Sequence, residues 1–338
     1  MRAAIVGCGS IASVHAKSIR KLPGNELVGF ADIKEERARA FADEYGGRAY
    51  SNLEEMLERE RPEVLHICTP HYLHVPMAIY GLEKGCHVFM EKPPAISKEQ
   101  FAELERACLN AGKKLGVCFQ NRYNPSVIEA KRLLASGKAG RILGARGLVT
   151  WSRGGAYYTE SGWRGRLETE GGGALINQSI HTLDLITGFL GKPLWVEATA
   201  ANHHLKGIIE VEDTMEACIY YEGREGERIP ALFYATTAYC DDVPPLIEIA
   251  CEHVTIRIED LDVTLYYRDG RVEKPAIDRK EALGKSYWGS GHKDCIEDFY
   301  RCCAGGTHFA QELDGIRDTA RLMLACYESA RGQKAVSL

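Results

Sequence analysis

Three polar side chains recur at helical spacing inside an otherwise apolar stretch at residues 174–190. Asn177, His181 and Asp184 stand four and three residues apart, so in a helix they share one face. Such a face could be a row of side chains that contacts a ligand. It could also be a polar stripe buried against a sheet, with His181 as a hydrogen-bonded structural residue. Spacing alone favours this second interpretation.

A second candidate, Lys92, follows the apolar run at residues 87–90. Ligands of open α/β sheets bind outside the carboxyl ends of the strands, which is where this lysine would stand. A lysine there could donate a proton to a carbonyl oxygen or accept one from a carbinol. Exposed lysines after strands are also common, so Lys92 taken alone favours neither interpretation.

A glycine-rich segment, Gly7-Cys8-Gly9-Ser10-Ile11-Ala12, has the G-x-G-x-x-A form and separates an apolar run from a helical pattern. The first glycine permits a tight turn, and the second lets the backbone approach a pyrophosphate. The small Ala12 allows close packing of helix on strand. Ser10 and Ile11 open the helix, whose free N–H groups and positive dipole end favour phosphates. An accidental glycine turn would not explain the matching strand and helix.

Asp32 ends the next apolar run, 20 residues after Ala12. A carboxylate at this place accepts hydrogen bonds from ribose hydroxyls. It predicts NAD as the cofactor, because it would repel the 2′-phosphate of NADP. Lys34 and Arg37 stand close by and could soften this preference, so NADP stays open. They could equally be solvated residues at the start of a helix.

The hydrophobic pattern predicts the elements that would position these residues. Over the first 120 residues short apolar runs alternate with helical patterns. The expected strands are 3–6, 27–31, 64–68, 87–90 and 115–119, and the expected helices are 12–22, 35–45, 73–84 and 98–111. This alternation predicts an α/β domain with a doubly wound parallel sheet.

From about residue 140 the pattern changes to successive strands separated by turns. Strands are expected at 142–151, 195–201, 214–221, 231–238, 246–250, 254–258 and 263–267. Helices are expected at 174–190, 294–303 and 314–330. The pattern predicts a second domain built on one largely antiparallel sheet.

Composition narrows the function classes. A chain of 338 residues with a net charge of −5 and no long basic run is a poor candidate for binding nucleic acid or an anionic membrane. The 12 cysteines form no Cys-x-x-Cys pair, so we interpret most of them as buried apolar residues in a reducing cytoplasm. His292-x-x-Cys295 is the nearest approach to a zinc motif. It lacks partners at ligand spacing, so we predict no metal.

Several longer motifs resemble the glucose–fructose oxidoreductase/inositol dehydrogenase (Gfo/Idh/MocA) family. They lie at 68–74 (CTPHYLH), 85–93 (GCHVFMEKP), 121–125 (NRYNP), 171–184 (GGGALINQSIHTLD) and 327–331 (YESAR). The resemblance therefore extends over essentially the whole chain.

This resemblance implies an N-terminal Rossmann domain over residues 1–122 and a C-terminal α/β domain over 123–338. The second domain would bind substrate and carry a large, open, mostly antiparallel sheet that joins copies into a homodimer or homotetramer. The implied activity is that of an NAD(P)-dependent dehydrogenase acting on hydroxyl groups of sugars, sugar derivatives or cyclitols.

The same resemblance implies roles for individual residues. Lys92 would be the catalytic acid–base or its proton-relay partner, and His181 would join it in the site. Residues along the nicotinamide half of the cofactor would be Thr69, Pro70, His74 and Glu91, with Asn121 also in the cofactor site.

One position departs from part of the family. Asn177 stands where inositol dehydrogenase-like members have an aspartate, and an amide cannot serve as a base. The proton task would then fall more heavily on Lys92 and His181. The Asn-Gln-Ser-x-His form, with GWRG at 162–165, resembles members that oxidise the C3 hydroxyl of hexoses, including nucleotide-linked uronic acids.

Four further residues are expected to contact the substrate. A tryptophan face at Trp163 suits the C–H face of a pyranose, and Arg122 and Arg164 suit hydroxyls, a carboxylate or a phosphate. His292 matches a family position near the substrate. In the alternative interpretation the tryptophan packs, the arginines are solvated and His292 is a neighbour of a helix cap.

Two other functions stay open at this point. One is a redox-neutral, glycoside-cleaving enzyme that retains NAD and oxidises and re-reduces one sugar. The other is a non-catalytic sensor of sugar or NAD on the same fold. The presence of Lys92 and His181 disfavours the sensor, because a pure binding protein has no use for a proton-relay pair.

Overall fold

The computed structural model describes residues 1–278, 282–284 and 289–338, and the chain divides into two compact units. The first unit comprises Met1–Gln120 and Glu281–Ile316. The second comprises Asn121–Lys280 and Arg317–Leu338. The break at Gln120 and Asn121 lies close to the predicted boundary after residue 122.

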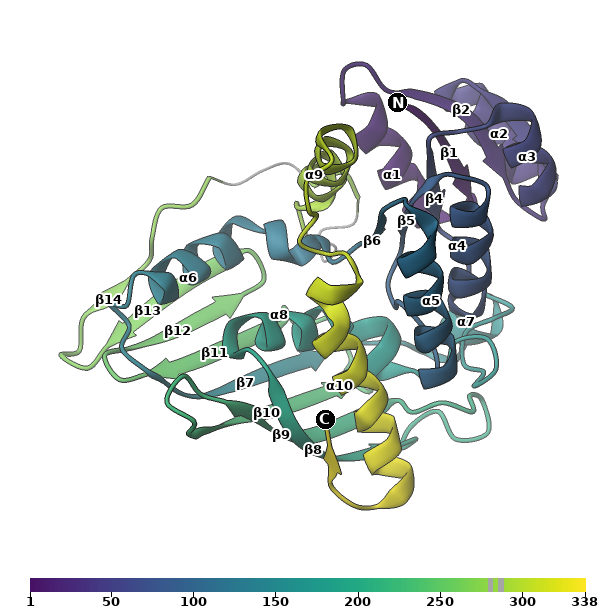
Figure 1. Cartoon of the computed structure of the whole chain (residues 1–338). Coiled ribbons are helices and arrows are strands. Elements are labelled where there is room, and N and C mark those ends of the chain that lie inside the picture. Colours follow the sequence, from purple (N-terminus) through teal and green to yellow (C-terminus); the bar gives the residue numbers. More distant parts are fainter. Residues whose placement is uncertain (279–281, 285–288) are drawn as a thin grey trace. The chain divides into compact units, whose positions relative to one another are not determined.

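The first unit is built on a six-stranded parallel sheet with the order β3-β2-β1-β4-β5-β6 (Figure 1). Its strands are β1 (Arg2–Val6), β2 (Glu26–Ala31), β3 (Arg48–Tyr50), β4 (Val64–Ile67), β5 (His87–Met90) and β6 (Leu115–Val117). Residues of both pleats are buried in β1 and β4, which is why these strands are continuous apolar runs in the sequence. The doubly wound parallel domain expected from the sequence is confirmed.

Helices of the first unit connect these strands in sequence. They are α1 (Ser10–Arg20), α2 (Glu35–Tyr45), α3 (Leu53–Glu60), α4 (His74–Glu83) and α5 (Lys98–Ala111), with a short 3₁₀ turn η1 (His71–Leu73) before α4. The hydrophobic pattern missed β3 and α3, since a three-residue strand and an eight-residue helix carry little periodicity.

A late segment of the chain returns to the first unit. Helix α9 (His292–Gly305) lies against α1 (Figure 1), and the ring of Phe299 stands 5.0 Å from that of Phe89 on β5. Gly116 on β6 makes room for this packing, because a Cβ there would lie 2.7 Å from Phe299. The predicted partition, which placed all of 123–338 in the second domain, differs from the structure in this segment. The apolar contacts that decide its place join residues far apart in the sequence, which no local pattern reveals.

The second unit holds a nine-stranded sheet with the order β14-β13-β12-β11-β7-β10-β9-β8-β15 (Figure 1). Its strands are β7 (Ile142–Thr150), β8 (Pro193–Ala201), β9 (Thr214–Glu222), β10 (Arg228–Thr236), β11 (Leu246–Cys251), β12 (Val254–Glu259), β13 (Asp262–Tyr267), β14 (Val272–Glu273) and β15 (Val336–Ser337). All neighbours are antiparallel except β7 and β10, which pair in parallel. The expected mostly antiparallel sheet is confirmed, with one parallel pair that the pattern could not reveal.

Helices cover one face of this sheet. They are α6 (Pro125–Ala135) against β12 and β13, α8 (Ile180–Leu190) against β7, and α10 (Leu313–Gly332), whose Ser329 accepts a hydrogen bond from the Ala198 N–H of β8. The chain also forms a short helix α7 (Gly155–Thr159) and a 3₁₀ turn η2 (Gln120–Tyr123). The opposite face leaves side chains such as Leu232 exposed.

The expected helix at 174–190 consists of two kinds of helix. Residues Ala174–Ser179 form a π-helical segment, η3, and the α-helix α8 begins at Ile180. π-Helical turns are rare and occur frequently at functional sites. Asn177 lies in this turn, and His181 lies in the first turn of α8.

All 12 cysteines are free thiols in the structure, and eight of them are buried while Cys240 is exposed. Among the described residues, no helix combines the length and apolar character that a membrane span requires.

Candidate functional site

The glycine loop of the first unit has the geometry that a dinucleotide needs. Gly7 has φ +87°, and a Cβ on it would lie 2.7 Å from the backbone carbon of Cys68, so only glycine fits this turn. A Cβ on Gly9 would have no neighbouring atom within 4 Å, which leaves its side of the loop open. Ser10 and Ile11 then begin α1, and Ala12 is fully buried against the sheet. The loop therefore has a tight turn at Gly7 that requires glycine, and at Gly9 its backbone is open to a ligand.

Asp32 stands at the end of β2, beside this loop. Its Oδ2 accepts a hydrogen bond from the Cys8 N–H at 2.8 Å, and its Oδ1 accepts one from the Lys34 N–H at 2.8 Å. The carboxylate is half-buried, whereas the side chains of Lys34 and Arg37 are exposed. The Asp32 carboxyl group is therefore held beside the open glycine loop, and this arrangement fits NAD.

His74 braces two loops of the first unit rather than standing open to a ligand. It is fully buried, with Nδ1 at 2.9 Å from the Pro93 carbonyl oxygen and Nε2 at 2.9 Å from the Thr69 carbonyl oxygen. Burial lowers the pKa of His74, although both carbonyls raise it. The loop after β4, with Thr69 and Pro70, is thus tied to the loop after β5, with Lys92.

Two buried oxygen atoms among the predicted cofactor contacts have no hydrogen-bond partner within the described part of the chain. They are Oγ1 of Thr69 in the first unit and Oδ1 of Asn121, the first residue of the second unit. A buried polar atom without a partner costs free energy, so each of these atoms indicates, within its own unit, a place for a polar group of a ligand. Lys92 follows β5 and is half-exposed.

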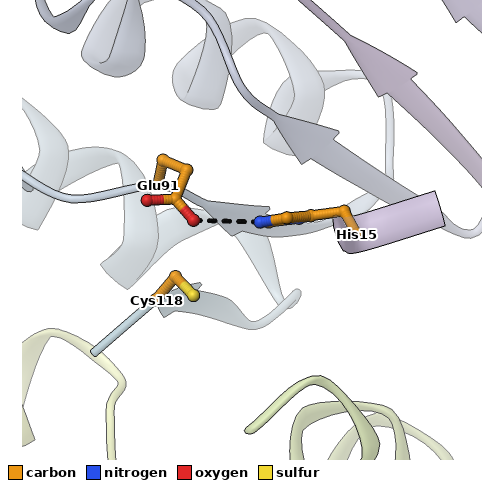
Figure 2. Close-up of side chains that lie close together, drawn as sticks. All are labelled: His15, Glu91 and Cys118. Carbon is orange, nitrogen blue, oxygen red and sulfur yellow. Dashed lines mark hydrogen bonds and ion pairs between the residues drawn. The ribbon is translucent and has the colours of Figure 1, made fainter. Parts of the chain in front are cut away.

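Glu91 belongs to a buried hydrogen-bonded chain, not to the open edge of the site. Its Oε1 lies 2.9 Å from Nε2 of His15, His15 Nδ1 lies 2.9 Å from Nδ1 of His66, and His66 Nε2 lies 2.9 Å from the Tyr300 hydroxyl. All four residues are buried. Figure 2 shows Glu91 and His15 facing each other beside Cys118. The chain links β5, α1, β4 and α9 inside the first unit.

Electrostatic interactions make Glu91 and His15, within this series of hydrogen bonds, a buried ion pair. Burial alone lowers the pKa of His15, but hydrogen bonds to Cys118 and Glu91 and the charge of Glu91 raise it to about 9. Burial alone raises the pKa of Glu91, but His15 lowers it far below its ordinary value. Burial keeps the pKa of His66 well below its ordinary value, so the charge resides on His15.

The same cluster contains donor atoms of the kinds that metals bind. His15, Glu91 and Cys118 place a nitrogen, an oxygen and a sulfur within 4.8 Å of one another (Figure 2). Both ring nitrogens of His15 are already hydrogen-bonded, one to Glu91 and one to His66. An ion would have to break one of these bonds, and the buried ion pair accounts for the cluster without it.

His292 lies in the first unit at the start of α9, close to this pair. Burial lowers its pKa to about 4, while the charge of Glu91 raises it and that of His15 lowers it. A neutral, buried His292 is therefore a neighbour of Glu91 in this unit. Its predicted role as a substrate contact stays a prediction.

Asn177 and His181 of the second unit stand half-exposed on one side of the η3–α8 segment. The Asn177 amide donates from Nδ2 to Oε1 of Glu170 at 2.5 Å. Glu170 is fully buried, and its Oε2 accepts a hydrogen bond from the Gly165 N–H at 2.5 Å. Burial raises the pKa of Glu170 to about 7, although Gly165, Asn177 and Arg164 lower it.

Glu170 was not expected from the sequence. It precedes the three glycines at 171–173 in the segment RLETE, which looks like an ordinary charged loop. A second buried acid, Glu212, lies nearby and accepts hydrogen bonds from the N–H groups of Gly173 and Leu175 and from the Tyr327 hydroxyl. No spacing in the sequence links either acid to Asn177.

Asp184, the third residue of the predicted polar row, has a structural role. It binds the Arg122 guanidinium through two hydrogen bonds of 2.8 and 2.5 Å and accepts a third from Thr319. Asp184 is almost fully buried. Arg122 is expected to contact the substrate, but two of its N–H groups already donate to Asp184 in this buried pair.

Trp163 and Arg164 are part of a stack of aromatic and guanidinium groups. The Arg164 guanidinium lies 4.5 Å from the ring centre of Tyr157 and 4.8 Å from that of Trp163. The Tyr157 hydroxyl accepts a hydrogen bond from Nε2 of Gln178, next to Asn177. Both Trp163 and Arg164 are half-exposed in the same unit as Asn177.

Comparison with protein families gives two matches. Residues 1–119 match a family described as oxidoreductases with an NAD-binding Rossmann fold, and residues 127–257 match the GFO/IDH/MocA C-terminal domain. Between them the two matches cover well over half of the chain, in the order and places that the two units occupy.

Individual relatives agree with this assignment. The chain is 31% identical over 237 residues to D-glucoside 3-dehydrogenase of Escherichia coli (strain K12), covering 69% of this chain and 63% of the relative. It is 29% identical over 184 residues to glucose-6-phosphate 3-dehydrogenase of Bacillus subtilis (strain 168), covering 54% of this chain and 51% of the relative. The chain thus spans between half and two thirds of the length of these curated relatives.

A solved structure matches over the full length. It is the WlbA dehydrogenase from Bordetella pertussis in complex with NADH and UDP-GlcNAcA. The identity is 29%, the TM-score is 0.86, and the match covers 100% of this chain and 98% of that chain.

Proposed function

Because the chain belongs to the GFO/IDH/MocA family of oxidoreductases, we propose that it transfers a hydride between NAD and a hydroxyl-bearing carbon of a sugar or cyclitol. The observation that carries this proposal is the sheet of the first unit. Strand β1 leads into the glycine loop with Asp32 beside it, and Lys92 follows the end of β5 in the same sheet. The proposed cofactor site, formed by the glycine loop and Asp32, and the proposed acid–base residue, Lys92, thus lie at the carboxyl edge of the same sheet. Ligands of such sheets bind at this edge.

In the proposed reaction individual residues have the following roles. NAD, when bound, accepts the hydride from the carbon that bears the hydroxyl. Lys92 takes up the proton that leaves the hydroxyl, for which its amine must come within about 3 Å of that oxygen. The Thr69 hydroxyl and the Asn121 amide oxygen supply hydrogen bonds along the cofactor, and Asp32 holds a ribose.

We assign the sugar to residues of the second unit. Asn177 and His181 supply hydrogen bonds to its hydroxyls, and His181 shares or relays the proton. Trp163 offers a face to the C–H side of a pyranose. Arg164 offers a guanidinium to a hydroxyl or an anionic substituent. The C3 carbon of a hexose ring is the proposed site of oxidation, in line with the 3-dehydrogenases among the relatives.

The experiment is a cofactor-reduction assay across four kinds of substrate. Purified protein and NAD are given methyl β-D-glucoside, glucose 6-phosphate, myo-inositol or UDP-linked N-acetylglucosaminuronic acid, and NADH formation is measured. We expect NADH with at least one of them. NAD that co-purifies with the protein and never gives net NADH would contradict the proposal and favour the redox-neutral alternative. The named relatives are dehydrogenases and do not favour that alternative.

Cofactor preference is tested at Asp32. Asp32→Ala should weaken NAD binding about tenfold, the usual scale for losing a hydrogen bond to a charged group, and should lessen the preference over NADP. Asp32→Asn is the matched variant, because it keeps an acceptor for the Cys8 N–H and removes the charge together with the second acceptor, which the Lys34 N–H uses. Fluorescence titration with both cofactors measures the effect. Tighter binding of NADP than NAD by the unmutated chain would refute the assignment of Asp32 to the ribose.

We also propose that copies of the chain associate through the uncovered face of the nine-stranded sheet. This face exposes Leu232 and Tyr266 and carries the stacked rings of Trp195 and Tyr220, 4.5 Å apart. Large exposed apolar side chains on one face are typical of protein contacts. A homodimer or homotetramer is expected. A monomer mass measured by light scattering of the purified protein would contradict this proposal.

The free thiols suit a reducing cytoplasm, where we propose that the protein works.

A further inference from the structure

Lys92 lies between two residues that buried histidines hold in place. Glu91 precedes it and Pro93 follows it, directly after strand β5. A carboxylate oxygen of Glu91 is hydrogen-bonded to His15, and the carbonyl oxygen of Pro93 is hydrogen-bonded to His74. Both histidines are fully buried in the first unit. The chain on either side of Lys92 is therefore anchored to the interior of this unit.

The first anchor joins Glu91 to helix α1. Oε1 of Glu91 lies 2.9 Å from Nε2 of His15 (Figure 2), and the Glu91 N–H donates to the carbonyl oxygen of Ile67 on β4 at 3.0 Å. The ring of His15 also packs against that of Phe89 on β5, with 5.7 Å between the ring centres. Helix α1 begins at Ser10, directly after the glycine loop. The side chain of Glu91 is thus fixed to the helix that follows this loop.

The second anchor joins Pro93 to the loop after β4. Nδ1 of His74 lies 2.9 Å from the Pro93 carbonyl oxygen, and Nε2 lies 2.9 Å from the Thr69 carbonyl oxygen. Both oxygens only accept hydrogen bonds, so the ring donates to one of them when neutral and to both when protonated. The rigid, buried ring lies between the two carbonyls at the start of α4. Pro93 is thus fixed to the loop of Thr69, which is predicted to lie along the nicotinamide.

Acid–base catalysis by a lysine depends on anchors of this kind. A flexible aliphatic stem separates the amine from the backbone. The amine works only within about 3 Å of the reacting oxygen. A misplacement of about 1 Å can lower the rate of a reaction about a hundredfold. The position of the Lys92 backbone limits where its amine can reach, so the contacts that hold its two neighbours bear directly on catalysis.

We propose that His15 and His74 are positioning residues for Lys92. By holding Glu91 and Pro93, they place the Lys92 amine for proton transfer and join it to the two segments predicted to bind NAD, the glycine loop and the loop after β4. This inference rests on the proposed function, in which Lys92 takes up the proton of the hydroxyl. Binding of the cofactor and placement of the acid–base residue thus depend on the same buried contacts.

The first test needs no substrate. The NAD-free protein is acetylated slowly with N-hydroxysulfosuccinimide acetate, and mass spectrometry of peptides gives the rate at Lys92 relative to that at exposed Lys84. This ratio should rise several-fold in His74→Leu and in the double variant His15→Leu with Glu91→Leu, because a released side chain is more mobile and more accessible to the reagent. An unchanged ratio in both variants would overturn the proposal, whether or not any sugar is a substrate. A changed ratio with no active sugar would contradict only the proposed function.

The second test separates positioning from stability. The double variant His15→Leu with Glu91→Leu leaves no unpaired buried charge, so the chain should stay folded. With the best sugar of the four-substrate assay, its kcat should still fall by about ten- to a hundredfold, while NAD binding stays within a few-fold. His15→Gln keeps an N–H for Glu91 and should retain most of kcat. Normal turnover in the folded double variant would contradict the role of His15. If the double variant does not fold, His74→Leu decides.

The third test determines whether a positioning residue acts through Lys92. We expect His74→Leu to lower kcat about tenfold and Lys92→Met to lower it about a hundredfold. The combined variant should then lose about a hundredfold and not a thousandfold, because the effects of residues that act as a unit do not add. A loss of about a thousandfold would mean that His74 supports activity independently of Lys92, and the proposal would be wrong.

A matched control removes a hydrogen bond of the same buried network at a place away from Lys92. The Tyr300 hydroxyl lies 2.9 Å from Nε2 of His66, at the opposite end of the network from Glu91. Tyr300→Phe removes this bond and leaves the bond between His15 and Glu91 in place. It should change neither kcat nor the acetylation of Lys92. If Tyr300→Phe lowers kcat as much as the double variant does, any damage to the network has the same effect and the proposal fails.

Discussion

Lys92→Met should lower kcat by about a hundredfold or more, the usual scale for losing general acid–base catalysis, while NAD binding stays within a few-fold. Methionine keeps most of the length of the side chain and removes the group that holds the proton. The binding of NAD should survive, because its proposed contacts, the glycine loop and Asp32, follow other strands of the sheet. Steady-state kinetics with the best sugar, and a separate fluorescence titration with NAD, measure the two effects.

The control for this variant is a lysine of the same unit away from the strand end. Lys84 is exposed after α4 and lies 5.1 Å from the ring centre of Tyr80. Lys84→Met should leave kcat unchanged. His181→Asn should lower kcat less than Lys92→Met if His181 relays or orients. Near-normal turnover in Lys92→Met would remove Lys92 from the mechanism and move the base to His181.

Features that depend on neighbours in sequence were predictable. The turn at Gly7, the open approach at Gly9 and the acid at Asp32 follow from one strand, one loop and the next strand, and the structure forms all three. The apolar runs of the first unit predicted its parallel sheet, because strands covered on both faces leave an unbroken pattern. Helical periodicity likewise placed the segment with Asn177 and His181 on a helix.

Features that depend on distant residues were not predictable. His15, His66, Glu91 and Tyr300 come from four elements, and only folding brings them within hydrogen-bonding distance. Nothing in the pattern distinguishes His15 from a surface residue of an amphipathic helix. The contact of Glu170 with Asn177 likewise depends on the π-turn of η3, and no periodicity reveals such a turn. The role of Asp184 was hidden because a buried ion pair and a ligand-facing row have the same spacing.

The buried ion pair of His15 and Glu91 leads to the largest expected effect on stability. His15→Leu should lower the free energy of unfolding by about 3–5 kcal/mol, because it leaves the Glu91 charge buried without its partner. The double variant His15→Leu with Glu91→Leu should recover most of that loss, since it leaves no unpaired charge. His308→Leu is the matched control. It removes a histidine paired with Asp314 on the surface, where both side chains are more than half exposed, and should have little effect.

The pH dependence of stability identifies the charged state of the pair. The pKa of His15 is raised from 6.5 to about 9, so its contribution is complete below pH 6.5 and is lost as the pH rises through 9. The pKa of Glu91 is lowered from 4.5, so its contribution is complete above pH 4.5 and is lost only in strong acid. Urea unfolding should therefore show the unmutated chain losing about 3 kcal/mol more than the double variant between pH 6 and pH 9.5. Parallel pH curves for the two proteins would mean that His15 is neutral in the folded chain. The neutral ring of His15 would then donate its N–H to the Glu91 carboxylate. The positive charge that balances Glu91 would have to come from another group.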